Sequence, residues 1–298
     1  KTILITGVAG FIGFNLCKKL TEENFDIIGI DNLNSYYDVN LKEARLRELN
    51  KTNKSFKFFK IDIEDTKNIN EIFQKYKPNV VYNLAAQAGV RYSIENPIAF
   101  INTNIKGFLN ILEASRINRI DHLIYASSSS VYGGNMQLPY SENNIVDHPV
   151  SIYAATKKSN ELMAHTYSHL YSIPCTGLRF FTVYGPWGRP DMSYFLFTKS
   201  ILSGEKIKIF NNGNMSRDFT YIDDICESLR RLMNKMPYGE KDFYKKNPSI
   251  HSSWAPHKIF NIGNSKSISL MEFIETIEEE LGQKALKNFL PMQPGDVQ

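Results

Sequence analysis

The sequence predicts an α/β protein built on a doubly wound parallel sheet, followed by a smaller C-terminal lobe. Through residues 1–180, short apolar runs alternate with stretches of helical periodicity, which is the pattern of successive βαβ units. The apolar runs are nearly continuous, which indicates strands buried on both faces of the sheet. A glycine-rich segment separates the first apolar run from the first helical stretch. These observations favour a Rossmann-type sheet.

The first 180 residues are expected to form one domain whose crossover connections are right-handed. The runs expected to form strands are 2–6, 25–30, 56–61, 80–84, 123–126 and 175–180. The stretches expected to form helices are 11–23, 39–49, 66–76, 97–115 and 152–171.

Beyond about residue 181 the alternation breaks down, so we expect a smaller lobe over 181–298. Its expected elements are helices at 194–203, 223–235 and 270–281 and strands at 206–210, 218–222 and 258–262. The helix 223–235, with Asp223 as N-cap, is expected to complete the first domain. The polar segment 237–256 is interpreted as a surface insertion, and Gly282 is expected to end the last helix.

Composition narrows the class of protein. The 298 residues are 42% hydrophobic and 22% charged, as in a globular enzyme, and no apolar stretch approaches the ~18 to 20 residues of a membrane helix. Lysines and arginines are scattered, so the net charge of +4 indicates an anionic small substrate rather than nucleic acid. Three widely spaced cysteines form no disulfide framework or metal motif. We therefore expect a cytoplasmic enzyme with no metal, membrane or nucleic-acid partner.

The segment Gly7-Val-Ala-Gly10-Phe-Ile-Gly13 follows the first strand and opens the first helix. Glycines there allow a tight turn and a close approach of backbone to a diphosphate, and the helix N-terminus favours its negative charge. Asp31 ends the next strand, where a carboxylate accepts hydrogen bonds from ribose hydroxyls and repels a 2′-phosphate. The sequence therefore predicts NAD rather than NADP. Asp62, after the third strand, is either an adenine contact or a helix cap.

Tyr153 and Lys157 are four residues apart in a predicted helix and therefore share one face. A tyrosine hydroxyl has an ordinary pKa near ~10, so it acts as a base at neutral pH only where a positive charge favours the phenolate. Lys157 and an oxidised nicotinamide are expected to supply that charge. A run of four serines, 127–130, follows the fifth strand, where hydroxyls can hold a sugar hydroxyl without adding charge.

These motifs together resemble the extended, sugar-nucleotide-modifying branch of the short-chain dehydrogenase/reductase superfamily, over essentially the whole chain. The resemblance implies that Tyr153, Lys157 and Ser128 are catalytic, since Ser128 lies 25 residues before Tyr153 as in epimerases of the branch. It also implies that the segment 83–86 lines the nicotinamide. The predicted cofactor-binding residues are Gly7, Gly10, Phe11, Ile12, Gly13, Asp31, Asn32, Asp62, Ile63, Leu84, Ala85, Ala86, Tyr153 and Lys157.

Two neighbours of Ser128 indicate the reaction. Related 4,6-dehydratases carry Asp-Glu where Ser129 and Ser130 stand, and related decarboxylases carry Glu at the second position. Neither carboxylate is present, which favours C4 epimerisation with nothing eliminated. The segments 87–97, 164–169, 178–192 and 291–297 are similar to those of bacterial UDP-glucuronate 4-epimerases of capsule or lipopolysaccharide biosynthesis.

That resemblance predicts interconversion of UDP-glucuronate and UDP-galacturonate for polysaccharide synthesis. The alternatives are a UDP-hexose 4-epimerase, then a UDP-glucuronate decarboxylase. A non-catalytic NAD(H) sensor on the same fold is the alternative from another class, and the intact Tyr153, Lys157 and Ser128 set speaks against it.

The expected substrate-binding residues are Ser128, Ser129, Thr182, Arg189, Arg91, Arg217, Gln293 and Asp296. Arg189 is the first candidate to hold a sugar carboxylate, because a guanidinium offers a planar fork of donors. Arg91 is the second candidate. By the resemblance, Arg217 contacts the UDP diphosphate and Asp296 the uridine ribose, while Gln293 replaces an arginine of hexose epimerases.

The resemblance also implies two features outside the site. Helices 97–115 and 153–171 pair with their counterparts in a homodimer of the family, and both carry broad apolar faces here. Family members usually continue beyond residue 298, so we expect a C-terminal tail that this sequence lacks.

Overall fold

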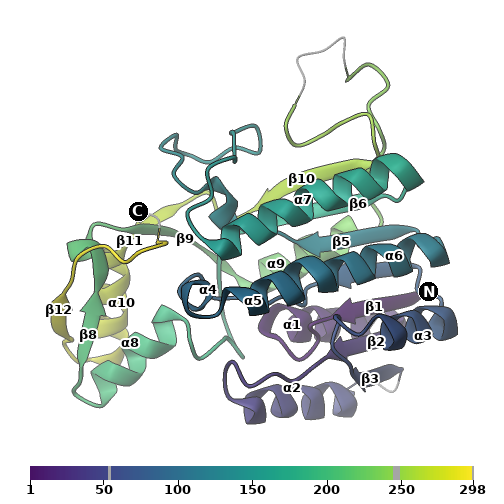
Figure 1. The fold of residues 1–298 in the computed structure, drawn as a ribbon. Helices are drawn as coiled ribbons and strands as arrows, with labels where there is room; N and C mark the ends of the chain where they lie inside the picture. Colours follow the sequence, from purple (N-terminus) through teal and green to yellow (C-terminus); the bar gives the residue numbers. More distant parts are fainter. Residues whose placement is uncertain (53–54, 244–248, 297–298) are drawn as a thin grey trace.

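The computed structural model describes residues 1–52, 55–243 and 249–296. A parallel seven-stranded sheet organises the larger part of the molecule, with strand order β10-β6-β5-β4-β1-β2-β3 (Figure 1). Its strands are β1 (Thr2–Thr6), β2 (Asp26–Asp31), β3 (Phe56–Lys60), β4 (Val80–Asn83), β5 (His122–Ala126), β6 (Cys175–Phe180) and β10 (His257–Ile262). The strand order reverses direction at β1, and the crevice beyond the carboxyl ends of β1 and β4 is where such sheets bind ligands. The predicted Rossmann-type fold is confirmed.

Successive residues of each strand point to opposite sides of the sheet, so both faces present apolar side chains. Helices cover both of these faces. Ile3 and Ile5 of β1 pack with α1 (Phe11–Leu20), α2 (Val39–Thr52) and α9 (Ile222–Leu232). Leu4, between them, packs with the other layer, formed by α3 (Thr66–Tyr76), α6 (Phe108–Asn118) and α7 (Ile152–Tyr171).

A smaller group of elements lies beyond the carboxyl ends of the strands, on the left in Figure 1. It contains the three-stranded sheet β11-β9-β7 and the parallel pair β12-β8. The bounds are β7 (Thr182–Tyr184), β8 (Lys206–Ile209), β9 (Ser216–Tyr221), β11 (Ser267–Ser269), β12 (Leu286–Phe289), α8 (Ser193–Leu202) and α10 (Leu270–Leu281). Four buried isoleucines form its core: Ile201, Ile207, Ile209 and Ile274.

The structure differs from the sequence expectations in several elements. The segment 97–115 is not one α-helix: α5 (Pro97–Phe100) and α6 flank a π-helical stretch, Ile101–Gly107, and the short α4 (Tyr92–Glu95) precedes them. The strand expected at 258–262 is β10, which joins the main sheet beside β6 rather than the smaller lobe. Asp223 is not the N-cap of α9, which begins at Ile222 after Tyr221. Within the expected insertion 237–256, residues 244–248 lie outside the described residues.

Candidate active site

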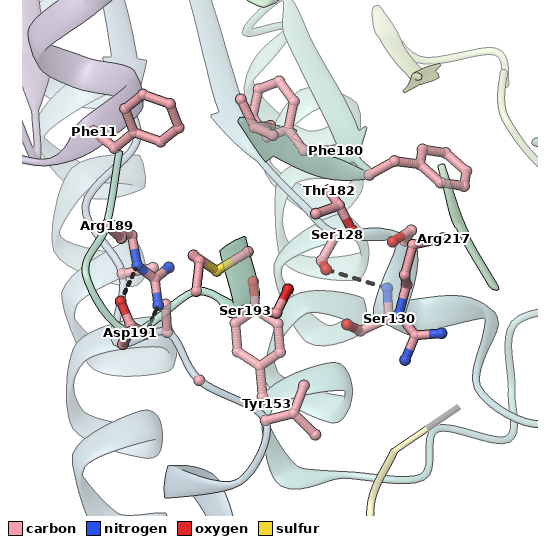
Figure 2. A pocket seen from close by; sticks show the side chains of 18 of the residues that line it. Phe11, Ser128, Ser130, Tyr153, Phe180, Thr182, Arg189, Asp191, Ser193 and Arg217 are labelled. Carbon is pink, nitrogen blue, oxygen red and sulfur yellow. Dashed lines mark hydrogen bonds and ion pairs between the residues drawn. The ribbon is translucent and has the colours of Figure 1, made fainter. Parts of the chain in front are cut away.

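A cavity of about 1380 Å³ opens at the carboxyl ends of the sheet, between the sheet and the smaller lobe. All of the site residues expected from the sequence line this one cavity. They are Gly7, Gly10, Phe11, Ile12, Gly13, Asp31, Asn32, Asp62, Ile63, Leu84, Ala85, Ala86, Arg91, Ser128, Ser129, Tyr153, Lys157, Thr182, Arg189, Arg217, Gln293 and Asp296. Figure 2 shows Tyr153 between Arg189 on one side and Ser128 with Arg217 on the other.

The glycine-rich loop leaves no room for side chains. Gly7 has a φ of +71°, and a Cβ on it would lie 2.8 Å from the backbone nitrogen of Ala85. A Cβ on Gly13 would lie 2.2 Å from the carbonyl oxygen of Gly7. Helix α1 then begins at Phe11 with no acidic side chain in its first turn. Because the first N–H groups of a helix have no intrahelical partner, this loop can receive an anion.

Asp31 lies directly beneath that loop at the end of β2. Its carboxylate accepts hydrogen bonds from the backbone N–H of Ala9 (3.1 Å) and of Leu33 (2.9 Å). Burial raises its pKa, and these hydrogen bonds together with the charges of Lys42 and Arg45 oppose that rise. A carboxylate oxygen holds more than one lone pair, so Asp31 can also accept from a ribose hydroxyl.

Tyr153 and Lys157 lie on the same face of α7, whose first turn is capped by the Ser151 side chain. Burial raises the pKa of Tyr153, while a hydrogen bond with Ser128 and the positive charge of Arg189 lower it. The Lys157 ammonium donates to the carbonyl oxygen of Ala126 (3.0 Å), and burial lowers its pKa to about 8. Arg189 therefore supplies a positive charge near Tyr153, in addition to the charges expected from Lys157 and an oxidised nicotinamide.

The serine run divides between the core and the cavity. Ser127 donates to Glu161 (2.7 Å), which also accepts from the fully buried Arg179 at 2.8 Å. The Ser128 hydroxyl accepts from the backbone N–H of Ser130 (3.1 Å), as Figure 2 shows. Glu161 is two turns beyond Tyr153 on α7, so the same helix that carries the tyrosine also holds the strand end that carries Ser128.

Arg189 is already paired within the chain. Its Nε donates to Asp191 (3.0 Å) and its Nη2 donates to the second oxygen of that carboxylate, as Figure 2 shows. Tyr36 also donates to Asp191, at 3.3 Å. Burial lowers the pKa of Arg189, but the ion pair with Asp191 outweighs burial and raises it. The guanidinium is therefore charged and fixed in orientation.

Asp296 lies between two arginines of the cavity wall. Its carboxylate oxygens are 3.7 Å from Arg91 and 3.7 Å from Arg217. The Arg91 guanidinium also stacks over Phe210, 4.7 Å from the ring centre. Burial lowers the pKa of Arg217, while the charge of Asp296 raises it. The structure therefore brings two arginine cations together around the predicted ribose acceptor.

Several residues that shape this site were not identified from the sequence. Asp191 orients Arg189, Glu161 fixes Ser127, and Arg45 contacts both the glycine-rich loop and the turn before Arg189. Asp191 lies two residues from Arg189 and Glu161 four residues from Lys157, so spacing alone could have suggested both. Arg45 has no such signal, because three of its four acceptors are backbone carbonyls that lie 36 to 143 residues away in the sequence.

Comparison with known proteins identifies the family of this chain. Residues 3–263 match the model of the NAD dependent epimerase/dehydratase family, and the chain belongs to that family. Protein CapI of Staphylococcus aureus is 57% identical over 99% of this chain and 88% of its own length. A probable UDP-glucuronate 4-epimerase of Rhizobium meliloti is 48% identical over 99% of this chain and 86% of its own length. These matches confirm the family resemblance stated from the motifs.

A solved structure supports the same relationship. The crystal structure of UDP-glucuronic acid 4-epimerase from Bacillus cereus, in complex with UDP-glucuronic acid and NAD, superposes with a TM-score of 0.87. It is 34% identical in sequence, and the alignment covers 99% of this chain and 88% of that chain.

Two further findings concern membranes and metals. In the described parts of the chain, no helix is long and apolar enough to cross a membrane. Among the same residues, no three His, Cys, Asp or Glu side chains gather in a metal-binding group.

Proposed function

We propose that this chain is an NAD-dependent UDP-glucuronate 4-epimerase that interconverts UDP-glucuronate and UDP-galacturonate. The observation that carries the proposal is one cavity that brings Tyr153, Lys157 and Ser128 together with Arg189 and the glycine-rich loop. The relatives from Rhizobium meliloti and Bacillus cereus support it, because both carry this activity in their names.

The glycine-rich loop and Asp31 fit NAD. The loop is so tight that a Cβ at Gly7 or Gly13 would meet backbone. It leads directly into α1, whose first N–H groups have no intrahelical partner and would face a diphosphate. Asp31 would hold the adenosine ribose and disfavour a 2′-phosphate. Held by this loop and Asp31, NAD would supply reversible hydride transfer with C4 of the sugar.

The chain's own residues handle the proton. Tyr153 as phenolate accepts the proton of the C4 hydroxyl, and Ser128 orients that hydroxyl by hydrogen bonding. The sugar then turns about its diphosphate linkage and presents its other face, after which Tyr153 returns the proton to the oxygen. Because burial disfavours the phenolate, the positive charges near Tyr153 set how readily it forms at neutral pH.

Arg189 would recognise the sugar carboxylate. Asp191 takes the Nε–H and one Nη2–H, so the donors offered to the substrate are those of Nη1 and the second Nη2–H, with the Thr182 hydroxyl in the same cavity. A 4-keto glucuronate is a β-keto acid and loses CO₂ when its carboxylate bond aligns with the carbonyl π orbitals. A guanidinium fixed by Asp191 can hold the carboxylate out of that alignment until C4 is reduced again.

The nucleotide would bind at the opposite end of the cavity. Arg217 and Arg91 would contact the diphosphate, Asp296 the uridine ribose, and Gln293 a nearby polar group. In this arrangement residues 1–180, with β10 and α9, form the cofactor-binding domain, and the remainder of 181–298 forms most of the nucleotide-sugar lobe.

The protein would act as a homodimer in the cytoplasm, in the synthesis of surface polysaccharide. Exposed apolar side chains on the two candidate dimer helices support the first point: Ile98, Ile101, Leu109, Ile152 and Leu162 are each at least 40% exposed.

The test is incubation of the purified protein with UDP-glucuronate or UDP-glucose, without added cofactor, followed by anion-exchange separation of the products. We expect UDP-galacturonate from the first substrate and little or no UDP-galactose from the second. Preferred conversion of UDP-glucose would contradict the proposal and favour a hexose epimerase. Release of CO₂ with a pentose product would instead indicate a decarboxylase.

A further inference from the structure

Arg45 is a fully buried arginine in the middle of α2, and it does not line the cavity. Its Nη1 donates to the carbonyl oxygen of Ala9 (2.8 Å) and to the hydroxyl of Tyr37 (2.7 Å). The Ala9 peptide is therefore held on both sides, since its N–H donates to Asp31. One end of the guanidinium thus fixes the glycine-rich loop.

The other end of the same guanidinium fixes a turn that is about 140 residues away in sequence. Its Nη2 donates to the carbonyl oxygens of Trp187 (2.6 Å) and Gly188 (3.2 Å). The next residue is Arg189, so the backbone that carries the proposed acid-recognition side chain is anchored directly to Arg45.

That turn needs an anchor, because its conformation is not one that the chain prefers. Trp187 has a φ of +64°, in the left-handed region that residues with a Cβ disfavour. Its ring lies 5.2 Å from that of Phe14 on α1. Beyond the turn, Asp191 is held by Tyr36. The loop that carries Arg189 is therefore fastened before and after this residue to elements of the cofactor half.

A guanidinium suits this junction better than an ammonium. The fork of donors is planar and fixed, so it can serve acceptors on two sides at once, whereas a lysine offers donors from a single nitrogen. The four acceptors of Arg45 are three carbonyl oxygens and one hydroxyl oxygen, which carry no formal charge. The contacts therefore place backbone segments rather than neutralise a charged pair.

We propose that Arg45 is a positioning residue for acid recognition: it joins the glycine-rich loop to the 187–188 turn and thereby sets where Arg189 meets the sugar carboxylate. The inference rests on the proposed role of Arg189. Since one cation holds both segments, a displacement of either segment is transmitted to the other. Discrimination between a carboxylate and a hydroxymethyl group at C6 then depends on a residue that touches neither substrate nor cofactor.

The experiment uses the full chain with Trp254→Phe as background, so that Trp187 is the only tryptophan. Arg45→Met and Arg45→Lys are compared with Arg47→Met, a matched control on the same helix whose side chain is 65% exposed. For each variant kcat and KM are measured for UDP-glucuronate and UDP-glucose, together with bound NAD, CO₂ release and acrylamide quenching of Trp187.

We expect Arg45→Met to lower the preference for UDP-glucuronate by roughly 10- to 100-fold, mostly through KM, because small displacements of positioning groups have effects of that size. Quenching of Trp187 and CO₂ release should both rise. Arg45→Lys should be intermediate, and it decides the matter if Arg45→Met does not fold. Arg47→Met should match the background.

The proposal is overturned if the Arg45 variants change only the melting temperature or the NAD content, with preference and quenching equal to the control. Arg189→Ala separates the two possible failures. If Arg189→Ala lowers the preference and the Arg45 variants do not, positioning by Arg45 is wrong while the function of Arg189 stands. If Arg189→Ala itself leaves the preference unchanged, acid recognition lies elsewhere and both ideas fail.

Discussion

The cofactor half and the substrate half of the cavity differ in the chemical groups that form them. The cofactor half depends on backbone: Gly7 and Gly13 exclude any side chain, and the carboxylate of Asp31 is fixed by two backbone N–H groups. The other half depends on long side chains that are paired with carboxylates of the same chain, Arg189 with Asp191 and Arg91 with Asp296. The first half is complete before a ligand arrives, whereas the second must share or exchange partners with an anionic substrate.

The largest effect is expected on the chemical step, and it tests whether turnover can be lost while ligand binding by the two halves of the cavity is retained. Tyr153→Phe should reduce turnover by roughly 10²–10⁴-fold, the usual size of an acid–base contribution, and should leave UDP-sugar affinity nearly unchanged. Steady-state kinetics and calorimetric titration measure the two quantities. Near-native turnover would show that Tyr153 is not the base.

Arg189→Ala tests the side-chain half. Loss of a charge-assisted contact should weaken UDP-glucuronate binding by about 2 kcal/mol or more and should leave UDP-glucose nearly unaffected. Product ratio, CO₂ release and NADH absorbance measure the consequences, and Arg189→Lys should recover part of the affinity. Equal discrimination between the two substrates would move acid recognition to Arg91 or to the groups around Thr182.

Gly13→Ala tests the backbone half. The added Cβ would lie 2.2 Å from the carbonyl oxygen of Gly7, so the loop must shift, and overpacking of this kind costs about 1–3 kcal/mol of unfolding free energy. We also expect less NAD in the purified protein. Gly134→Ala is the matched control, because nothing lies within 4 Å of its added Cβ. Unchanged stability and NAD content would show that the cofactor half does not depend on a loop that excludes side chains.

The smallest effect is expected for Arg91→Ala. Arg91 is 52% exposed and lies 3.7 Å from Asp296, so its ion pair should contribute less than about 1 kcal/mol. KM for UDP-glucuronate should rise less than about fivefold, and the difference should shrink at high salt. A larger, salt-independent rise would show that Arg91 contributes as much to substrate binding as Arg217 does.

The same contrast explains what the sequence could predict. The strand–glycine–helix pattern predicted the tight loop at Gly7, Gly10 and Gly13 and the position of Asp31 at the end of β2, because the pattern itself lies within residues 2–31. Tyr153, Lys157 and Ser128 were brought to the cavity as the motifs indicated. These features are local, or follow from the carboxyl edge of the sheet.

What the sequence did not reveal depends on distant partners. Glu278 begins a run of three glutamates, a pattern typical of a solvated helix face, yet it is 2% exposed and accepts from Lys284 and Lys287. β10 reads as a strand of the smaller lobe until its pairing with β6 is seen. The π-helical stretch at 101–107 has no glycine or proline inside its first turn to mark it. In each case the deciding contact lies outside the local sequence window.

The geometry of the glycine-rich loop has a consequence for redesign. An added Cβ at Gly10 would press closely on the carbonyl oxygen of Gly7, at 3.0 Å, and one at Gly13 would collide with the same atom, at 2.2 Å. The position of this one carbonyl therefore restricts both Gly10 and Gly13, so a side chain at either position meets the same backbone atom. Freedom to alter nucleotide preference lies instead just past β2, where Asn32 and Leu33 carry side chains and where a change leaves that carbonyl untouched.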